Sequence, residues 1–233
     1  DFEELVDIYK EQIGYLVKGG VDLLVVETIM SLQECRAALI AAKESCDLPV
    51  MVSMTFESDG RTLYGTDAKT AAIVLESLDA AAIGANCSTG PDKMIAIIKD
   101  MAKVTTVPII AKPNAGIPTL DKDGSTVYDM NCEDFADGMA ELVKVGASIL
   151  GGCCGTTPDY IRKLSDKTKN IVINKRQGSE KRYLTSERKT IEFTLNDNFI
   201  IVGERINPTG KKKFQEQIRN DNLEMVIEFA REQ

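Results

Sequence analysis

The stretch VDLLVVET, residues 21–28, is an apolar run that follows Gly19 and Gly20 and ends in a glutamate and a threonine. A continuous apolar run of this kind is typical of a strand that is buried on both faces of a parallel sheet. Residues 1–18 carry apolar side chains at helical spacing, so we expect a helix before the strand that ends at the two glycines. The fold then depends on whether this helix and strand recur.

The same alternation does recur along the chain. Further strands are predicted at 50–56, 81–87, 108–114 and 147–154, and helices near 31–45, 67–79, 91–103, 132–145 and 158–168. This spacing implies a parallel sheet with right-handed crossovers, which is either an open doubly wound sheet or a (β/α)₈ TIM barrel. Polar residues close strand after strand, which favours the barrel, because an open sheet more often concentrates its chemistry at one switch point.

A complete barrel needs eight βα units, and the sequence supplies five. We therefore expect an α/β fold in the form of a partial barrel, its last five units, within a longer protein. Residues 170–198 are polar and charged and predict a linker or an exposed extension. From 199 to 233 a short apolar strand, a loop and an amphipathic helix resemble the first βα unit of a second barrel. The predicted domains are thus 1–169, a linker at 170–198, and 199–233.

The composition limits the class of function. The chain has 233 residues, 43% of them hydrophobic, and a net charge of −8 without a long basic run, so we expect a small-molecule partner and no nucleic acid. No apolar stretch reaches the roughly 18 residues that span a bilayer, and the start of the chain is acidic and amphipathic rather than signal-like. We expect a cytoplasmic protein without a membrane partner, in which the six cysteines are thiols or metal ligands.

The chain contains no histidine. This excludes an imidazole general base, any Ser-His or Cys-His pair, and any imidazole metal ligand. A metal site must therefore use cysteine, aspartate, glutamate or asparagine.

The stretch GGCCGTTP, residues 151–158, places Cys153 and Cys154 side by side. Neighbouring Cα atoms are about 3.8 Å apart, below the usual range for a disulfide. Cys87 ends an earlier predicted strand, and the carboxyl ends of barrel strands converge at one mouth. The flanking glycines free the backbone to bend, so the three sulfurs can face one ion. Three thiolates around Zn²⁺ with an open fourth position are typical of a catalytic site.

Three thiolates on Zn²⁺ give a centre of charge −1, which activates water weakly but suits an incoming soft thiol. Two other interpretations remain. A cysteine at a strand end can be a small apolar filler, which applies to Cys87 and, more strongly, to the helical Cys35, Cys46 and Cys132. The cluster can also be a structural zinc clip, with four protein ligands, in a non-catalytic binding module.

Several motifs carry a resemblance to a known family. GANCSTGP (84–91), KPNAG (112–116) and GGCCGTTPDYIRKL (151–164) resemble the homocysteine-binding, zinc-dependent methyltransferase domain. FIIVGERINPTGKKKF (199–214) resembles the opening of the methyltetrahydrofolate-binding domain of the cobalamin-dependent methionine synthase family. The order of these two motif sets is more specific than either set alone.

The resemblance implies a methyltransferase whose zinc is held by Cys87, Cys153 and Cys154. Homocysteine would bind zinc through its sulfur and take a methyl group from methylcobalamin, giving methionine. The resemblance places methylcobalamin on another domain of the full-length protein, where 5-methyltetrahydrofolate recharges it. The chain alone is expected to be inactive.

The alternative in the same class is a cobalamin-independent thiol methyltransferase with a betaine or sulfonium donor, or one fused to a folate reductase. The GERINPTG segment argues against this alternative.

The resemblance also assigns residues outside the cysteine cluster. Glu27 matches a strand-end glutamate that receives the substrate ammonium, although it can equally be a buried acid that accepts backbone hydrogen bonds. Two further expectations come from position in the sequence and not from the resemblance. From its place at a strand end, Asn114 is expected in the substrate pocket as a zinc ligand that homocysteine displaces, or else as an asparagine that caps a loop. From its place beside Cys87, Asn86 is expected to position that cysteine in the same pocket. Glu204 and Asn207 match positions at the pterin pocket of the second domain.

Overall fold

Five parallel strands form the sheet at the centre of the chain. In the computed structural model the strand order is β1-β2-β3-β4-β7, which follows the sequence without the reversal that marks a doubly wound sheet. The bounds are β1 (Leu24–Ile29), β2 (Val50–Met54), β3 (Ala82–Asn86), β4 (Ile109–Lys112) and β7 (Ile149–Leu150). The expected α/β fold with a parallel sheet is confirmed.

The structure describes residues 1–173, 181–194, 196 and 203–232. The chain divides into two compact units, Asp1–Thr194 and Leu195–Gln233, which are described separately. Within the described ranges, no helix has the length and apolar character that a membrane crossing requires.

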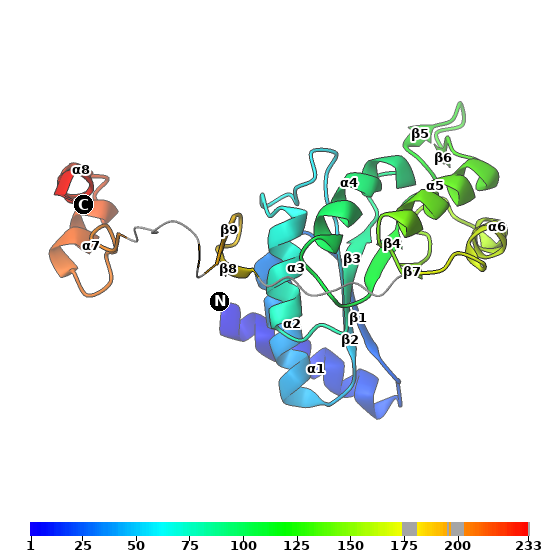
Figure 1. Cartoon of the computed structure of the whole chain (residues 1–233). Coiled ribbons are helices and arrows are strands. Elements are labelled where there is room, and N and C mark those ends of the chain that lie inside the picture. Colours follow the sequence, from blue (N-terminus) through cyan, green and yellow to red (C-terminus); the bar gives the residue numbers. More distant parts are fainter. Residues whose placement is uncertain (174–180, 195, 197–202, 233) are drawn as a thin grey trace. The chain divides into compact units, whose positions relative to one another are not determined.

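Helices alternate with the strands of the first unit (Figure 1). They are α1 (Phe2–Lys18), α2 (Leu32–Ser45), α3 (Ala68–Ser77), α4 (Pro91–Ala102), α5 (Cys132–Lys144) and α6 (Pro158–Thr168). Their starts follow local rules: the side chains of Ser31, Asp67 and Asn131 cap backbone N–H groups, and prolines open α4 and α6. Helices that follow one another in sequence pack side by side, α1 against α2 and onward to α6.

The core lies between the helices and the sheet. Its largest fully buried side chains include Phe56, Leu75, Ile83, Met101 and Phe135. Successive strand residues face opposite sides, so in β1 Leu24 is 5% exposed whereas Val25 is 46% exposed. The strand β1 is therefore buried on one face and open on the other.

An ion pair shows that the sheet is curved. The ammonium of Lys112, at the end of β4, pairs with the carboxylate of Glu27, near the end of β1. In a flat sheet two strands separated by two others lie about 14 Å apart, farther than these two side chains can jointly reach. The carboxyl end of the sheet therefore curves so that β1 approaches β4.

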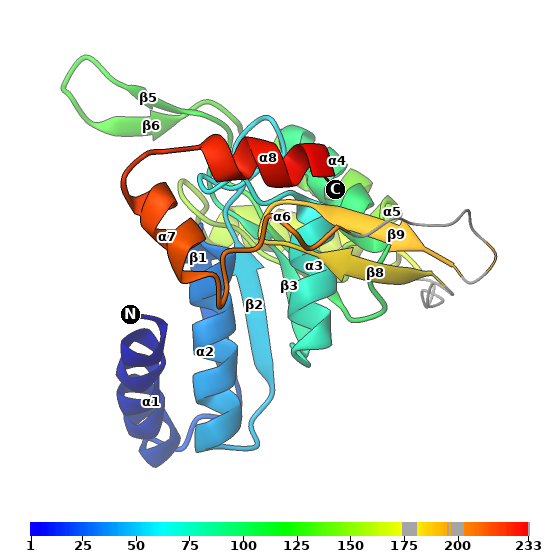
Figure 2. The same ribbon diagram turned by 90° about the vertical axis from the view of Figure 1, so that its left-hand side faces the viewer.

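The structure contains two hairpins that the sequence did not predict. β5 (Pro118–Leu120) and β6 (Thr126–Tyr128) lie between β4 and α5, and their hairpin projects beyond the helices (Figure 2). The region expected to be a linker, 170–198, contains β8 (Arg182–Thr185) and β9 (Thr190–Phe193), which pair antiparallel. This second hairpin belongs to the first unit, because β8 packs on α3.

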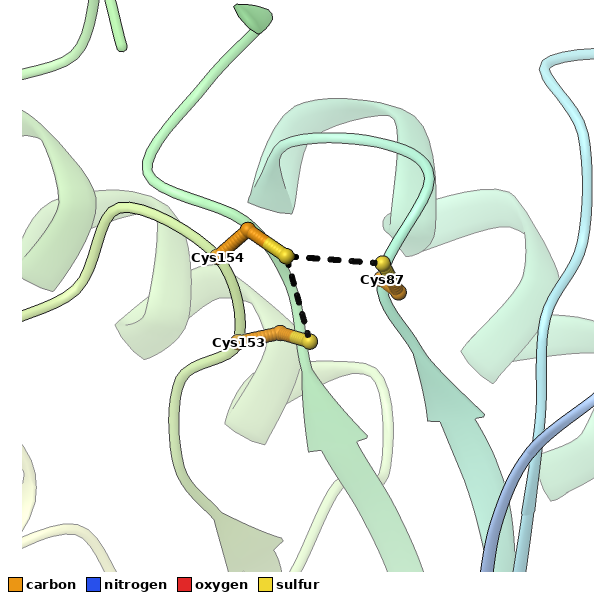
Figure 3. Close-up of side chains that lie close together, drawn as sticks. All are labelled: Cys87, Cys153 and Cys154. Carbon is orange, nitrogen blue, oxygen red and sulfur yellow. Dashed lines mark hydrogen bonds between the residues drawn. The ribbon is translucent and has the colours of Figure 1, made fainter. Parts of the chain in front are cut away.

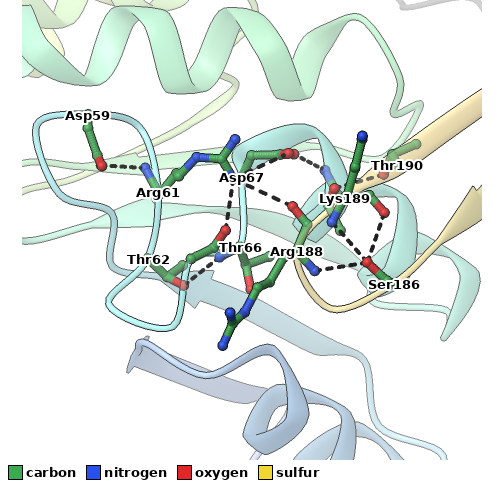
Figure 4. A network of polar contacts seen from close by, with 11 residues as sticks. Asp59, Arg61, Thr62, Thr66, Asp67, Ser186, Arg188, Lys189 and Thr190 are labelled. Atoms are coloured by element: carbon green, nitrogen blue, oxygen red, sulfur yellow. Dashed lines mark hydrogen bonds and ion pairs between the residues drawn. The ribbon is translucent and has the colours of Figure 1, made fainter. Parts of the chain in front are cut away.

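The hairpin β8–β9 is fastened to the first unit by polar contacts (Figure 4). The Arg61 guanidinium donates to the carbonyl of Gly65 at 2.8 Å and to that of Arg188 at 3.5 Å. Lys69, in α3, forms an ion pair with Glu192 at 2.8 Å. The polar composition that suggested a linker instead supplies these contacts.

One predicted strand is shorter than expected. The run 147–154 contributes only Ile149 and Leu150 to the sheet, since the chain leaves it at the glycines that follow. Residues 151–154 of the run belong to the loop that carries Cys153 and Cys154.

The described residues of the second unit form two helices where one was expected. α7 (Lys212–Arg219) and α8 (Glu224–Glu232) are separated by Asp221, whose φ of 53° is left-handed and ends the first helix. Phe214 and Phe229 pack edge to face, with ring centroids 5.0 Å apart, and join the two helices. The apolar strand expected at the start of this unit falls on residues outside those that the structure describes.

Candidate metal and substrate site

Three cysteine sulfurs meet at the carboxyl edge of the sheet (Figure 3). The Sγ atoms of Cys87 and Cys154 are 3.9 Å apart, those of Cys153 and Cys154 are 4.0 Å apart, and all three lie within 4.8 Å of one another. Tetrahedral Zn–S bonds of about 2.3 Å separate two sulfur ligands by about 3.8 Å. The sulfur triangle therefore has the size that one metal ion needs.

The end of β4 and the loop after it hold both cysteine segments, because β4 lies between β3 and β7 in the sheet. The N–H of Cys87 donates to the carbonyl of Lys112 at 3.1 Å, and the N–H of Cys153 donates to that of Pro113 at 2.9 Å. The carbonyl of Cys154 accepts from Ala115 at 2.9 Å. Cysteines that are 66 positions apart in the sequence are thus held by one short segment.

The backbone at Cys87 is unusual. Cys87 and Ser88 have φ values of 64° and 59°, a left-handed conformation that is uncommon outside glycine. Two such residues in succession turn the chain sharply from β3 toward α4. This turn directs the Cys87 side chain toward the other two cysteines (Figure 3).

The cysteine cluster is electrostatically unfavourable for thiolates without a cation. Burial raises the pKa of the Cys87 thiol to about 11, a hydrogen bond from the backbone of Ser88 opposes the rise, and the sulfurs of Cys153 and Cys154 add to it. A divalent cation reverses this balance, because it favours the ionised form of each ligand.

Two asparagines predicted as site residues contact the cysteines. Asn86 is fully buried, and its Nδ2 donates to Cys153 Sγ at 3.8 Å. Asn114 is 4% exposed, and its Oδ1 accepts from the backbone N–H of Cys154 at 3.1 Å. The structure brings both side chains to the cluster, each on one of the paired cysteines.

The carboxylate of Glu27 lies at the same edge of the sheet, paired with Lys112. Both side chains are partly exposed, at 36% and 30%, so the carboxylate is accessible and not a fully buried acid. Sequence reasoning missed Lys112 as a site residue, although a charged residue that closes the apolar run 109–112 was the available signal.

Tyr128 is a second residue that the sequence did not indicate. A side chain added at Gly155 would lie 2.4 Å from the Tyr128 ring, so the ring occupies the space beside the cysteine pair. Burial first, and then the neighbouring Cys154 sulfur, raise the pKa of the Tyr128 hydroxyl. The signal that would have located it was the turn DKDG at 121–124, which closes the hairpin β5–β6.

Glu204 and Asn207 lie in the second unit, before α7. The backbone N–H of Asn207 donates to the carbonyl of Glu204 at 3.0 Å, and the Asn207 side chain accepts from Thr209 at 3.0 Å. Both side chains belong to a turn that is exposed to solvent. The Glu204 carboxylate lies 4.0 Å from the ammonium of Lys211.

The fold and the site define a parallel α/β domain with a three-cysteine cluster that could hold a metal ion. A family model described as homocysteine S-methyltransferase matches residues 1–168. The chain belongs to the homocysteine S-methyltransferase family.

Two curated relatives are methionine synthases. The chain is 30% identical over 239 residues to methionine synthase of Mycobacterium tuberculosis and 29% identical over 244 residues to that of Mycobacterium leprae. Each match covers 100% of this chain and 20% of the relative, so the chain spans about a fifth of their length.

The fold is similar to that of the Escherichia coli homocysteine methyltransferase MmuM. The apo form superposes with a TM-score of 0.60 at 23% identity, covering 72% of this chain and 57% of that one. The metallated form gives a TM-score of 0.57 at 22% identity, covering 70% and 52%.

Proposed function

We propose that this region binds Zn²⁺ through Cys87, Cys153 and Cys154 and methylates the thiolate of homocysteine, giving methionine. The observation that carries the proposal is the sulfur triangle, whose edges of 3.9 and 4.0 Å match the spacing of three ligands on one tetrahedral ion. Membership of the homocysteine S-methyltransferase family supports the substrate.

We infer that the parallel sheet is part of a (β/α)₈ barrel that further βα units complete. The strand order supports this, because strands that are neighbours in sequence are neighbours in a barrel. The curvature shown by the Glu27–Lys112 ion pair is in the direction that closure requires. Completion would cover the open face of β1, where Val25 is 46% exposed.

The metal and the residues at the site would each have a separate role in the reaction. Zinc would supply a Lewis acid that keeps the incoming thiol ionised near neutral pH. Glu27 would accept the substrate ammonium and thereby orient its sulfur, while Asn114 holds the loop of Cys154 through the hydrogen bond at 3.1 Å. The absence of histidine from the sequence is compatible with this chemistry, since a thiol whose pKa a metal lowers can release its proton to solvent.

The methyl donor would be methylcobalamin carried elsewhere in the longer protein and recharged from 5-methyltetrahydrofolate. Glu204 and Asn207 would contribute to the folate site. The matches to methionine synthases support this donor, because they extend over 100% of the chain and so include the second unit.

Zinc-edge X-ray absorption with and without L-homocysteine tests the proposal. We expect one zinc per chain with three sulfur ligands, a fourth sulfur on addition of homocysteine, and loss of most zinc in Cys153→Ser. Cys46→Ser is the matched control, since Cys46 is a partly buried free cysteine outside the cluster. Zinc that already has four protein ligands and ignores homocysteine would instead indicate a structural clip.

A further inference from the structure

The carboxamide of Asn86 uses its full hydrogen-bonding capacity beside the cysteine cluster. Its Oδ1 accepts from the backbone N–H of Thr28 at 3.1 Å and from Ser53 Oγ at 2.8 Å. Its Nδ2 donates to Thr28 Oγ1 at 2.7 Å and to Cys153 Sγ at 3.8 Å. A primary amide offers two N–H donors and two lone pairs, so each of them has a partner.

Thr28 fixes the direction of this amide. A backbone N–H can only donate, so it must face Oδ1 and not the NH₂ group. A flipped Asn86 would set two donors against each other and turn its oxygen toward the sulfur of Cys153. Both contacts would be repulsive, and the group is fully buried, so the flip is costly. Cys153 therefore receives an N–H donor.

The backbone of Thr28 is strained in the conformation that makes these hydrogen bonds to Asn86. Its φ is 64°, a rare value for a β-branched residue, and the register of β1 against β2 shifts between Glu27 and Ile29. Irregularities of this kind re-aim side chains near functional sites and persist only when surrounding contacts enforce them. Here the contacts are those with Asn86.

The other two sulfurs have different surroundings. The Sγ atoms of Cys87 and Cys154 lie 3.9 Å apart, and the ring of Tyr128 lies beside the cysteine pair, where a Cβ at Gly155 would meet it at 2.4 Å. Among the described residues, the amide of Asn86 is thus the one side-chain N–H group within hydrogen-bonding distance of a sulfur of the cluster.

We propose that Asn86 is a positioning residue that caps the thiolate of Cys153 and so directs the methyl group away from this protein ligand and to the substrate sulfur. A hydrogen bond to an anionic sulfur withdraws charge from it and lowers its nucleophilicity without removing it from a metal. The S–CH₃ bond would then form on the incoming thiolate while the bond from the methyl group to its donor breaks and the donor leaves with that electron pair, so Cys153 would escape methylation. This inference rests on the proposed function and adds the basis of its selectivity.

The test is competitive alkylation of the zinc-loaded protein with limiting iodoacetamide, in which an S–C bond forms and iodide leaves. Mass spectrometry gives the share of label on each cysteine. Asn86→Leu should raise the share on Cys153 relative to Cys87 and Cys154 by about three- to tenfold. Ser53→Ala is the control, because it leaves the donor to Cys153 in place, and should give the wild-type pattern.

An unchanged pattern in Asn86→Leu, or an equal rise on all three cysteines, would overturn the inference. Zinc content is measured for each variant. If Asn86→Leu loses zinc, Asn86→Asp decides, since it keeps the size of the side chain and replaces the N–H donor to Cys153 with an acceptor. If zinc in the wild-type protein gains no sulfur ligand when homocysteine is added, the proposed function is refuted. If zinc does gain that ligand but the alkylation pattern of the variant is unchanged, this inference alone is refuted.

Discussion

The side-chain oxygen of Asn114 accepts a hydrogen bond from the backbone N–H of Cys154 at 3.1 Å. Asn114 follows β4 and is almost fully buried, so this bond ties the loop after β4 to the cysteine pair after β7. Of the two roles expected from the sequence, a zinc ligand or a loop cap, the bond corresponds to the second. The second lone pair of the oxygen is not used by this bond.

Asn114→Ala should weaken zinc binding by about ten- to a hundredfold, because it leaves a backbone N–H unpaired and frees the loop that aims Cys154. Chelator competition measures the zinc dissociation constant. Asn131→Ala is the matched control: Asn131 caps α5, so its loss should cost about 1 kcal/mol of stability and leave zinc affinity unchanged. Equal zinc affinity in Asn114→Ala and wild type would contradict this role.

Glu27→Gln should weaken homocysteine binding by about ten- to a hundredfold, the equivalent of one hydrogen bond to a charged group. Zinc content should not change, since Glu27 pairs with Lys112 and not with the cysteines. Isothermal titration of the zinc-loaded protein measures the affinity. Glu192→Gln, on the hairpin β8–β9, is the control for loss of a carboxylate elsewhere. Homocysteine affinity that is insensitive to Glu27→Gln would rule out the proposed ammonium contact.

Gly84→Ala and Gly14→Ala should have opposite effects on stability. A Cβ at Gly84, in β3, would lie 2.0 Å from the carbonyl oxygen of Ile110, so the sheet must distort, at a cost of about 3 kcal/mol or more. A Cβ at Gly14, in α1, meets no atom within 4 Å and should stabilise the helix by about 0.5–1 kcal/mol. Denaturant unfolding measures both; a similar midpoint for the two variants would contradict the packing at β3.

The Glu192 carboxyl should titrate near pH 2. Hydrogen bonds from Lys181 and then Lys69 lower its pKa to about 2 from the ordinary value of about 4.5. Because this pKa is lowered in the folded protein, the ion pairs of Glu192 stabilise the packing of the hairpin β8–β9 above about pH 4.5. This stabilisation is lost as the pH falls toward 2. Carbon-13 NMR of the carboxyl measures this. In Lys69→Met the pKa should move back toward its ordinary range, and a titration that stays near pH 2 would mean that Lys69 does not hold the hairpin.

Periodicity was a good guide to the helices and strands. The expected helix near 158–168 matches α6, and the expected 91–103 matches α4 to one residue, because prolines and apolar spacing mark those helices locally. The hairpins β5–β6 and β8–β9 were missed, since strands of three or four residues carry too few side chains for a period to emerge. The break between α7 and α8 was missed because it depends on a left-handed Asp221 rather than on glycine or proline.

Some residues of the candidate site were likewise predicted from the sequence, and others were found only in the structure. Cysteine content, the absence of histidine and the strand-end placement were sufficient to select Cys87, Cys153 and Cys154. The contributions of Lys112, Thr28 and Tyr128 required the structure. Their partners lie 85, 58 and 26 positions away in the chain, and no local window contains both members of such a pair.

The sequence by itself determined the parallel α/β fold and the chemical character of the site, since both depend on residue type and spacing within short windows. The tertiary structure decided the sulfur spacing, the curvature that joins Glu27 to Lys112 and the direction of the Asn86 amide. These depend on how the crossovers place distant strands in register, and on left-handed residues such as Thr28 and Cys87 that only surrounding contacts hold in place.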